Sequence, residues 1–234
     1  PGGVRARVAT RGGQGRLVTS QTVAQIGAEM DRRLVFTIPV ESVFTDCPDC
    51  ARLAYVGLNK ANAGRTAAYL FAQRLQGRSG SVLTTTSRRQ FQGEEARARA
   101  FAEEMARLCP KVSLHEASGG AGLALGTAER IRQAVAGLDH LLGVYSMGGA
   151  NAAILSTLAN EELEPEFFIA HDLDRENRSL LRRGRLAFVL HHDLRADLGQ
   201  AFQQITAYHK LRPPVSAQGP ADVQIITPAN CPRD

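Results

Sequence analysis

The chain has 234 residues, enough for one large domain or two small ones. Apolar residues make up 44% of it and charged residues 22%, a composition typical of a globular protein with a sizeable core. No run of about 18 apolar residues is present, so no transmembrane helix is predicted. The net charge of +5 comes from scattered arginines without interleaved aromatic residues, and it does not by itself indicate a nucleic-acid-binding surface.

The beginning of the chain has two short strand-like runs, at residues 4–8 and 17–19, followed by a helical pattern at 21–33. Neighbouring strands of a parallel sheet need a crossover of about ten residues or more. The seven residues between Val8 and Arg16 are too few for that crossover. Either the two strands form a hairpin, or part of the domain is absent from this chain; we favour the second interpretation.

From residue 34 onward, strand-like and helix-like segments alternate with short connections. Because each strand between residues 53 and 190 is followed by a helix, the pattern predicts an α/β fold whose parallel sheets are covered by helices on both faces. The predicted strands are 34–40, 53–58, 81–86, 112–116, 141–145, 167–170, 186–190 and 223–227, and the predicted helices are 61–75, 94–108, 125–136, 151–160, 175–183 and 194–210.

Two cysteines, Cys47 and Cys50, have the CxxC spacing of a redox pair or of half a zinc site. A zinc site needs a second pair, and Cys109 and Cys231 lie far apart in the sequence. A redox pair usually opens a helix, whereas this pair lies in a proline-containing loop between two predicted strands. We therefore interpret Cys47 and Cys50 as reduced loop residues.

Polar side chains follow the carboxyl ends of most predicted strands, the edge at which open α/β sheets bind ligands. They include carboxylates, an amide, a guanidinium and an imidazole, groups that suit a neutral sugar or polyol. Taken singly, Asn151, Asp172 and Asp193 could equally be helix caps, because each precedes a predicted helix, but the recurrence at several strand ends favours a ligand site. The predicted ligand-binding residues are Asp46, Arg97, Asn151, Asp172 and His192.

Other chemistries find less support. The glycine-rich segment 119–126 lies between a strand and a helix, as a dinucleotide loop does, but its spacing is GxGxxxG and no acid ends the next strand. His191 and His192 are adjacent on a strand and point to opposite faces, which disfavours a shared metal ion. No GxSxG elbow, P-loop or HExxH motif is present. We expect no catalytic residue, no metal and no cofactor, with an α/β enzyme as the least favoured alternative.

Five motifs follow one another from about residue 34 onward: Ile38-Pro39-Val40 followed by Asp46, Tyr55–Asn59 with Ala63–Ala67, Arg97–Phe101, Phe168–Asp172 and Ala187–Asp193. In their order and spacing they resemble motifs of the lactose-repressor family of regulators and the type 1 periplasmic sugar-binding proteins. The corresponding family motifs are the IPVV strand with its acidic loop, a crossover, RxxGF, vvGfD, and a strand with glutamine at the position of His192.

Several positions depart from the family pattern. Asn59 stands where the family has an aspartate, and Ala100 stands where it has a glycine. His192 replaces a glutamine, and Met147-Gly148 replaces an "ND" pair for which Asn151 could compensate. The resemblance therefore does not identify the ligand.

The resemblance implies two Rossmann-like lobes with parallel sheets, joined by three crossovers near 58–60, 191–194 and 212–222. An N-terminal lobe, incomplete at its start, would comprise residues 1–58 and 193–219, and a C-terminal lobe residues 59–192 and 220–234. A ligand would bind in the cleft between the lobes and hold them closed.

On this resemblance we expect the effector domain of a cytoplasmic bacterial transcriptional regulator, and not an enzyme. Its expected partners are a small sugar or polyol, a second copy of the chain in a homodimer, and DNA only through a helix-turn-helix domain absent from this chain; no membrane partner is expected. The alternative is a periplasmic solute-binding protein of a sugar ABC transporter. The lack of an apolar signal core after Pro1 favours the regulator.

Overall fold

The computed structural model describes residues 41–43, 46, 54–88, 92–213 and 219–232. The chain divides into two compact units: a smaller one, Pro1–Gly57 with Asp193–Ala221, and a larger one, Leu58–His192 with Asp222–Asp234. The predicted elements before residue 41 and the Cys47–Cys50 pair lie outside the described residues. Among the described helices, none combines the length and the apolar character that a membrane crossing requires.

A six-stranded sheet forms the centre of the larger unit, in the order β4-β3-β5-β6-β7-β8. The five strands that alternate with helices are parallel, as predicted. Strand β8 instead pairs antiparallel with β7, because the chain leaves this unit beyond the end of β7 and re-enters from the same edge. The strands are β3 (Gly80–Thr86), β4 (Val112–Ser118), β5 (Gly143–Ser146), β6 (Phe168–His171), β7 (Phe188–His191) and β8 (Gln224–Ile226).

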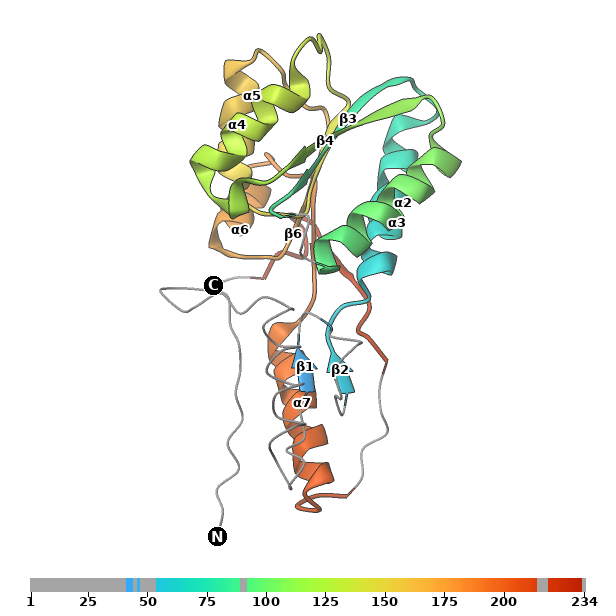
Figure 1. The fold of residues 1–234 in the computed structure, drawn as a ribbon, viewed down its shortest axis with the longest axis vertical. Coiled ribbons are helices and arrows are strands. Elements are labelled where there is room, and N and C mark those ends of the chain that lie inside the picture. The colour runs from blue at the N-terminus through green and yellow to red at the C-terminus, as the bar shows by residue number, and fades with distance from the viewer. Residues whose placement is uncertain (1–40, 44–45, 47–53, 89–91, 214–218, 233–234) are drawn as a thin grey trace, which may run out of the picture. The chain divides into compact units, whose positions relative to one another are not determined.

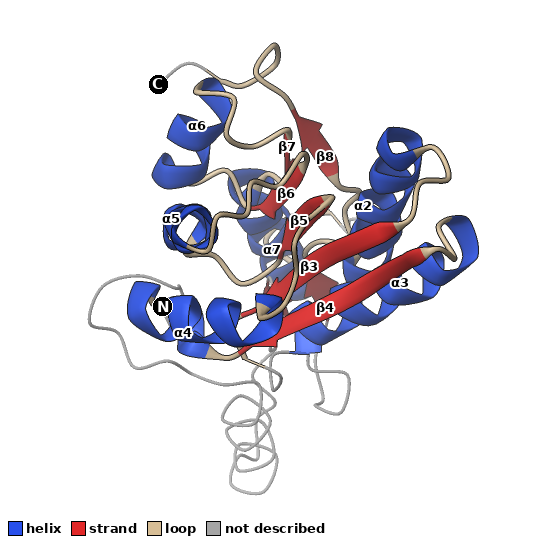
Figure 2. Cartoon of the chain, turned by 90° about the horizontal axis from the view of Figure 1, so that it is seen from above, coloured by secondary structure: helices blue, strands red, loops and turns tan. Residues whose placement is uncertain are grey.

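Helices cover both faces of this sheet (Figures 1 and 2), which confirms the predicted layers. One face carries α2 (Lys60–Leu75) and α3 (Gln92–Leu108) over a core rich in aromatic residues. The other face carries α4 (Ala124–Val135), α5 (Asn151–Asn160) and α6 (Arg175–Arg182) over an aliphatic core, and a short 3₁₀ turn, η1 (Gly120–Gly122), precedes α4.

Short polar side chains begin the helices that follow the strands. Oδ1 of Asn59 accepts from the backbone N–H of Asn62, 3.0 Å away, at the start of α2. Asp174 caps α6 in the same way, accepting from the N–H of Asn177 at 2.7 Å. These bonds satisfy amides that the helix itself leaves unpaired. Asn59, one of the departures from the family pattern, thus has a local structural role.

In the smaller unit, β1 (Glu41–Val43) pairs in parallel with β2 (Ala54–Val56), and α7 (Leu194–Tyr208) packs against both strands. The sequence interpretation ended the first strand at Val40 and placed residues 41–46 in a loop. The described strand β1 corrects this, because its pairing with β2 extends the ladder through Val43. Asp46 therefore lies three residues beyond a strand rather than six.

Candidate functional site

The carboxyl edge of the six-stranded sheet holds four of the five predicted ligand residues: Arg97, Asn151, Asp172 and His192 all belong to the larger unit. Asp46 belongs to the smaller unit, where it is partly buried, and its predicted role stays a prediction. The four residues are not alone at this edge. A buried Tyr145–His171 pair, which the sequence interpretation did not assign to the site, lies at the same edge.

Tyr145 and His171 stand at the ends of β5 and β6, and both are almost fully buried. The Tyr145 hydroxyl shares a 2.7 Å hydrogen bond with Nε2 of His171. Burial raises the pKa of Tyr145 well above its usual value, although the Arg97 charge opposes that shift. Burial, followed by the positive charge of Arg97 and Lys60, holds the pKa of His171 well below 6.5. Both rings are therefore neutral at pH 7.

Arg97 reaches this edge from α3, and only 6% of the residue is exposed. Its Nε is completely covered and has no hydrogen-bond partner. No hydrogen bond or ion pair joins its guanidinium to any residue in the described part of the chain. Its positive charge opposes ionisation of His171 and favours that of Tyr145, so it acts on both members of the pair.

Glu94 lies one helical turn before Arg97 and joins α3 to the end of β3. Its two carboxylate oxygens accept from the backbone N–H and the hydroxyl of Ser87, each at 2.6 Å. The loop after β5 packs closely here too, because a Cβ on Gly148 would lie 2.3 Å from the Ser87 nitrogen. Sequence reasoning missed Glu94; its spacing of three from Arg97, on one helix face, was the available signal.

Asn151 belongs to a buried amide network rather than to a helix cap. Its Nδ2 donates to Oδ1 of Asn177 at 2.7 Å, and its own Oδ1 is buried without a partner. Asn177 in turn donates to the backbone oxygens of His171 and Asp172, at 2.9 and 2.7 Å. The network therefore holds the loop that carries Asp172. The N-cap is Ala150 in α5 and Asp174 in α6, so the helix-cap alternative is wrong for Asn151 and Asp172. It is confirmed for Asp193, which caps α7.

Asp172 has a left-handed backbone, with φ of 64°, and half of its side chain is exposed. Its Oδ1 lies 3.9 Å from Nε2 of His192, a residue that is only 4% exposed. The neighbouring His191 is used differently, since its Nδ1 accepts from the N–H of Leu173 at 3.2 Å. Within the described ranges, no three His, Cys, Asp or Glu side chains are arranged to hold a metal ion.

The glycine-rich segment 119–126 serves packing. A Cβ on Gly120 would lie 2.5 Å from the Thr127 nitrogen, and one on Gly126 would lie 2.8 Å from the Gly120 Cα. The N–H of Ala121 also donates to the Ser87 carbonyl at 3.0 Å. Glycine at these positions therefore lets the loop lie directly against the start of α4.

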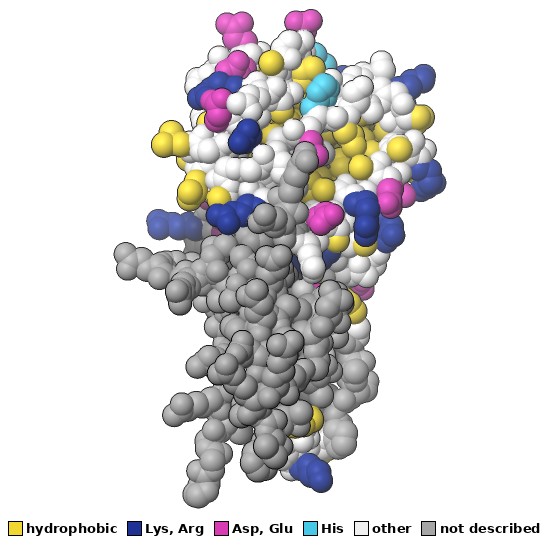
Figure 3. All heavy atoms as spheres, in the orientation of Figure 1, with side chains coloured by type: hydrophobic (Ala, Val, Ile, Leu, Met, Phe, Trp, Pro, Cys, Tyr) yellow, Lys and Arg dark blue, Asp and Glu magenta, His cyan; other side chains and the backbone are white. Residues whose placement is uncertain are grey.

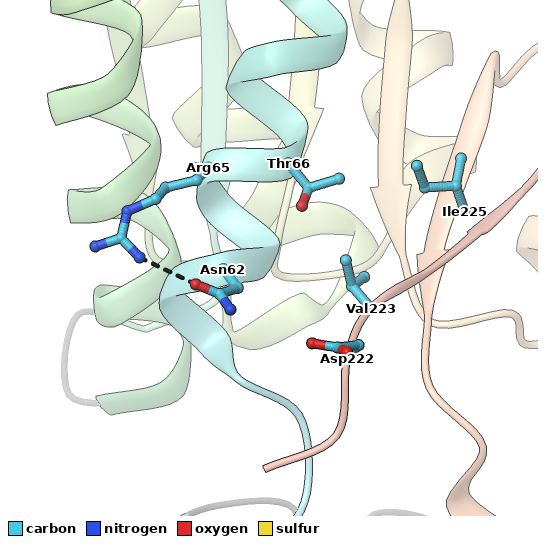
Figure 4. A pocket seen from close by; sticks show the side chains of 6 residues that line it. All are labelled: Asn62, Arg65, Thr66, Asp222, Val223 and Ile225. Carbon is cyan, nitrogen blue, oxygen red and sulfur yellow. Dashed lines mark hydrogen bonds between the residues drawn. The ribbon is translucent and has the colours of Figure 1, made fainter. Parts of the chain in front are cut away.

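A shallow pocket of about 400 Å³ opens elsewhere on the larger unit, between α2 and the segment that enters β8 (Figure 4). Asn62 and Arg65 point toward each other there and share a 3.1 Å hydrogen bond. None of the predicted ligand residues lines it. The pocket is lined by Asn62, Arg65, Thr66, Asp222, Val223 and Ile225.

Basic and acidic side chains alternate over the visible face of the larger unit (Figure 3). On that face the charges do not gather into a basic surface, which agrees with the scattered arginines of the sequence.

Comparison with known proteins agrees with this architecture. The periplasmic binding protein domain family matches residues 36–209. GanP, a glucose-galactose binding protein from Geobacillus stearothermophilus, is 17% identical with a TM-score of 0.79, over 92% of this chain and 75% of that protein. A protein described as a LacI transcriptional regulator from Bacteroides fragilis is 15% identical with a TM-score of 0.77, over 90% of this chain and 73% of that protein.

A sugar-binding protein of a sugar ABC transporter from Bacillus halodurans is 20% identical with a TM-score of 0.71, over 90% of this chain and 74% of that protein. No curated protein sequence matches the chain. At these identities, the structural likeness establishes the fold and leaves the ligand open.

Proposed function

The chain belongs to the periplasmic binding protein domain family, and we propose that it is the effector domain of a bacterial transcriptional regulator. In this proposal it binds a small sugar-like molecule at the carboxyl edge of the larger unit's sheet. The predicted role of the two compact units as lobes that close on a ligand stays a prediction.

The observation that carries the proposal is the unused hydrogen-bonding capacity at this edge. Nε of Arg97, Nδ1 of His171 and Oδ1 of Asn151 are all buried without partners. An unsatisfied buried polar group costs about 1–3 kcal/mol, so three of them at one edge favour a site that a polar ligand completes. The half-exposed Asp172 adds carboxylate oxygens that accept from hydroxyl groups.

Two different classes of protein share this fold, and each supports one function. The motifs around Arg97 and Asp172 resemble those of both classes, and one structural neighbour is described as a LacI transcriptional regulator, which supports the regulator. Other neighbours are sugar-binding proteins of transporters, which supports a solute-binding protein as the second candidate. As a regulator the protein would act in the cytoplasm as a homodimer and bind DNA through a separate helix-turn-helix domain.

Ligand binding is tested by thermal unfolding of the purified chain against a panel of sugars and polyols. We expect at least one compound to raise Tm, because binding to the folded state alone stabilises it. Asp172→Asn should remove that shift while retaining the fold, because asparagine tolerates the left-handed backbone at this position. Asp139→Asn, the same change at an exposed loop position, should leave the shift intact.

Unchanged ligand-induced shifts in Asp172→Asn would contradict the site assignment. The regulator and the solute-binding protein are separated by the oligomeric state, measured by light scattering at micromolar concentration. A dimer is expected for the regulator. A strict monomer would contradict it and favour the transporter alternative.

A further inference from the structure

Arg97 is a buried charge to which no described residue supplies a counter-ion. The residue is 6% exposed, and its guanidinium makes no hydrogen bond or ion pair with any residue that the structure describes. Burying a charge is expensive unless an opposite charge and hydrogen bonds compensate it. Folded proteins rarely retain such a group unless something else pairs with it.

The two acids at this edge are engaged elsewhere. Glu94 directs both carboxylate oxygens at Ser87, each bond being 2.6 Å long. Asp172 has its Oδ1 near His192 and is half exposed to solvent. Neither lies within 4.0 Å of the guanidinium in an ion pair, so the local acids do not replace a missing partner for Arg97.

A second cation lies close by. Lys60, the first residue of α2, packs against the start of α3, where a Cβ on Gly93 would be 3.4 Å from its Cε. The charges of Lys60 and Arg97 both act on the neutral ring of His171. Two cations, Lys60 and Arg97, thus share this edge with the carboxylates of Glu94 and Asp172.

We infer that the ligand is a sugar acid whose carboxylate pairs with the guanidinium of Arg97. This inference rests on the proposed sugar-binding function and adds the chemical class of the ligand. A carboxylate matches the planar guanidinium with two parallel hydrogen bonds, which a hydroxyl group cannot do. A phosphate ester is disfavoured, because it brings nearly two negative charges to an edge that already holds Glu94 and Asp172.

The test measures affinities for neutral and acidic members of matched pairs by calorimetry at pH 7.5. The pairs are D-glucose with D-glucuronate, D-galactose with D-galacturonate, and D-sorbitol with D-gluconate; D-glucose 6-phosphate forms a further arm. In at least one pair, the acid should bind about ten to a hundred times more tightly than its neutral partner, the range of a charge-assisted hydrogen-bonded pair. The phosphate should bind no better than neutral glucose.

In Arg97→Gln the affinity for the acid, divided by the affinity for its neutral partner, should fall close to one. If Arg97 had only a structural role, the substitution would lower both affinities by the same factor. Arg99→Gln is the matched control, because Arg99 lies on the same helix with its side chain 74% exposed, and it should keep the wild-type ratio. If Arg97→Gln does not fold, as judged by circular dichroism, Arg97→Lys takes its place. It keeps the charge without the planar fork and should lower the ratio at least threefold.

Neutral sugars that bind as tightly as their acids, or a ratio unaffected at Arg97, would overturn the sugar-acid inference and leave the proposed function standing. Preference for the phosphate would overturn it as well. If no sugar, acidic or neutral, binds the wild-type protein, the proposed function fails and the inference fails with it.

Discussion

The two edges of the six-stranded sheet each carry an arginine, and the surroundings of the two arginines are opposite. At the amino edge, Arg78 donates two hydrogen bonds to Glu166, at 2.8 and 2.6 Å, in partly exposed positions. His140 lies 3.0 Å from the same carboxylate. At the carboxyl edge, Arg97 is buried and lacks such a partner among the described residues.

This contrast separates structure from function within a single sheet. A satisfied and solvated ion pair needs nothing further and contributes little to stability. A buried group with unused hydrogen-bonding capacity is costly and points to an external partner. The amide network around Asn177 then explains how the carboxyl edge remains ordered, because it fixes the backbone beside Asp172.

The largest expected effect comes from Asn177→Ala, which removes the centre of that network. The variant leaves Nδ2 of Asn151 and the carbonyls of His171 and Asp172 without their side-chain partner. We expect the free energy of unfolding, measured in urea, to fall by about 3 kcal/mol. Asn160→Ala, at the exposed end of α5, should change it by less than about 0.5 kcal/mol. Equal losses in the two variants would show that the network does not hold the carboxyl edge.

A smaller effect is expected in how the free energy of unfolding depends on pH, through His171 at the carboxyl edge. The folded-state pKa of His171 lies below its unfolded value of about 6.5, so the unfolded chain binds more protons below that pH. Stability from this group is therefore complete above pH 6.5 and is lost on acidification. Between pH 7 and 5 we expect a loss of about 1–2 kcal/mol in the wild type.

In His171→Gln that loss should be reduced, whereas the exposed control His140→Gln should retain it. Unfolding curves at pH 7, 6 and 5 provide the measurement. A slope that persists in His171→Gln would assign the pH dependence to other groups.

The smallest effect on stability is expected from Glu166, at the amino edge of the sheet. Arg78, through its hydrogen bonds and charge, and His140 together lower the pKa of Glu166 to about 2, although burial opposes the shift. Because this pKa is depressed, its contribution is present above the unfolded pKa of about 4.5 and is lost as the pH falls toward 2. Glu166→Gln should lower Tm by about 1 °C at pH 7, and the difference should shrink at pH 3.

Glu164→Gln, with 84% of its side chain exposed, is the matched control and should leave Tm unchanged at both pH values. A difference that widens on acidification at Glu166 would contradict this account of the amino edge. If Glu166→Gln lowered the free energy of unfolding in urea as much as Asn177→Ala does, the contrast between the two edges would be removed.

The sequence by itself determined the succession of elements in the larger unit. Helical periodicity located α2 and α3, and apolar runs located the strands within a few residues. These signals are local, because burial of one face repeats every 3.6 residues in a helix. The alternation of strands and helices was also sufficient for the parallel sheet with two helix layers.

Only the tertiary structure decided which polar residues meet. Tyr145 and His171 are 26 residues apart and become neighbours because β5 pairs with β6, an arrangement that no local pattern encodes. The same pairing brings Asn151, which follows β5, to Asn177, which follows β6, and these residues are also 26 positions apart. Arg97 reaches the edge from α3 and has no counter-ion among the described residues. The direction of β8 likewise depends on where the chain re-enters the unit. Polar residues after the strands indicate in the sequence that a site exists. Which of their atoms find hydrogen-bond partners is decided only when strands that are distant in the sequence pair in register.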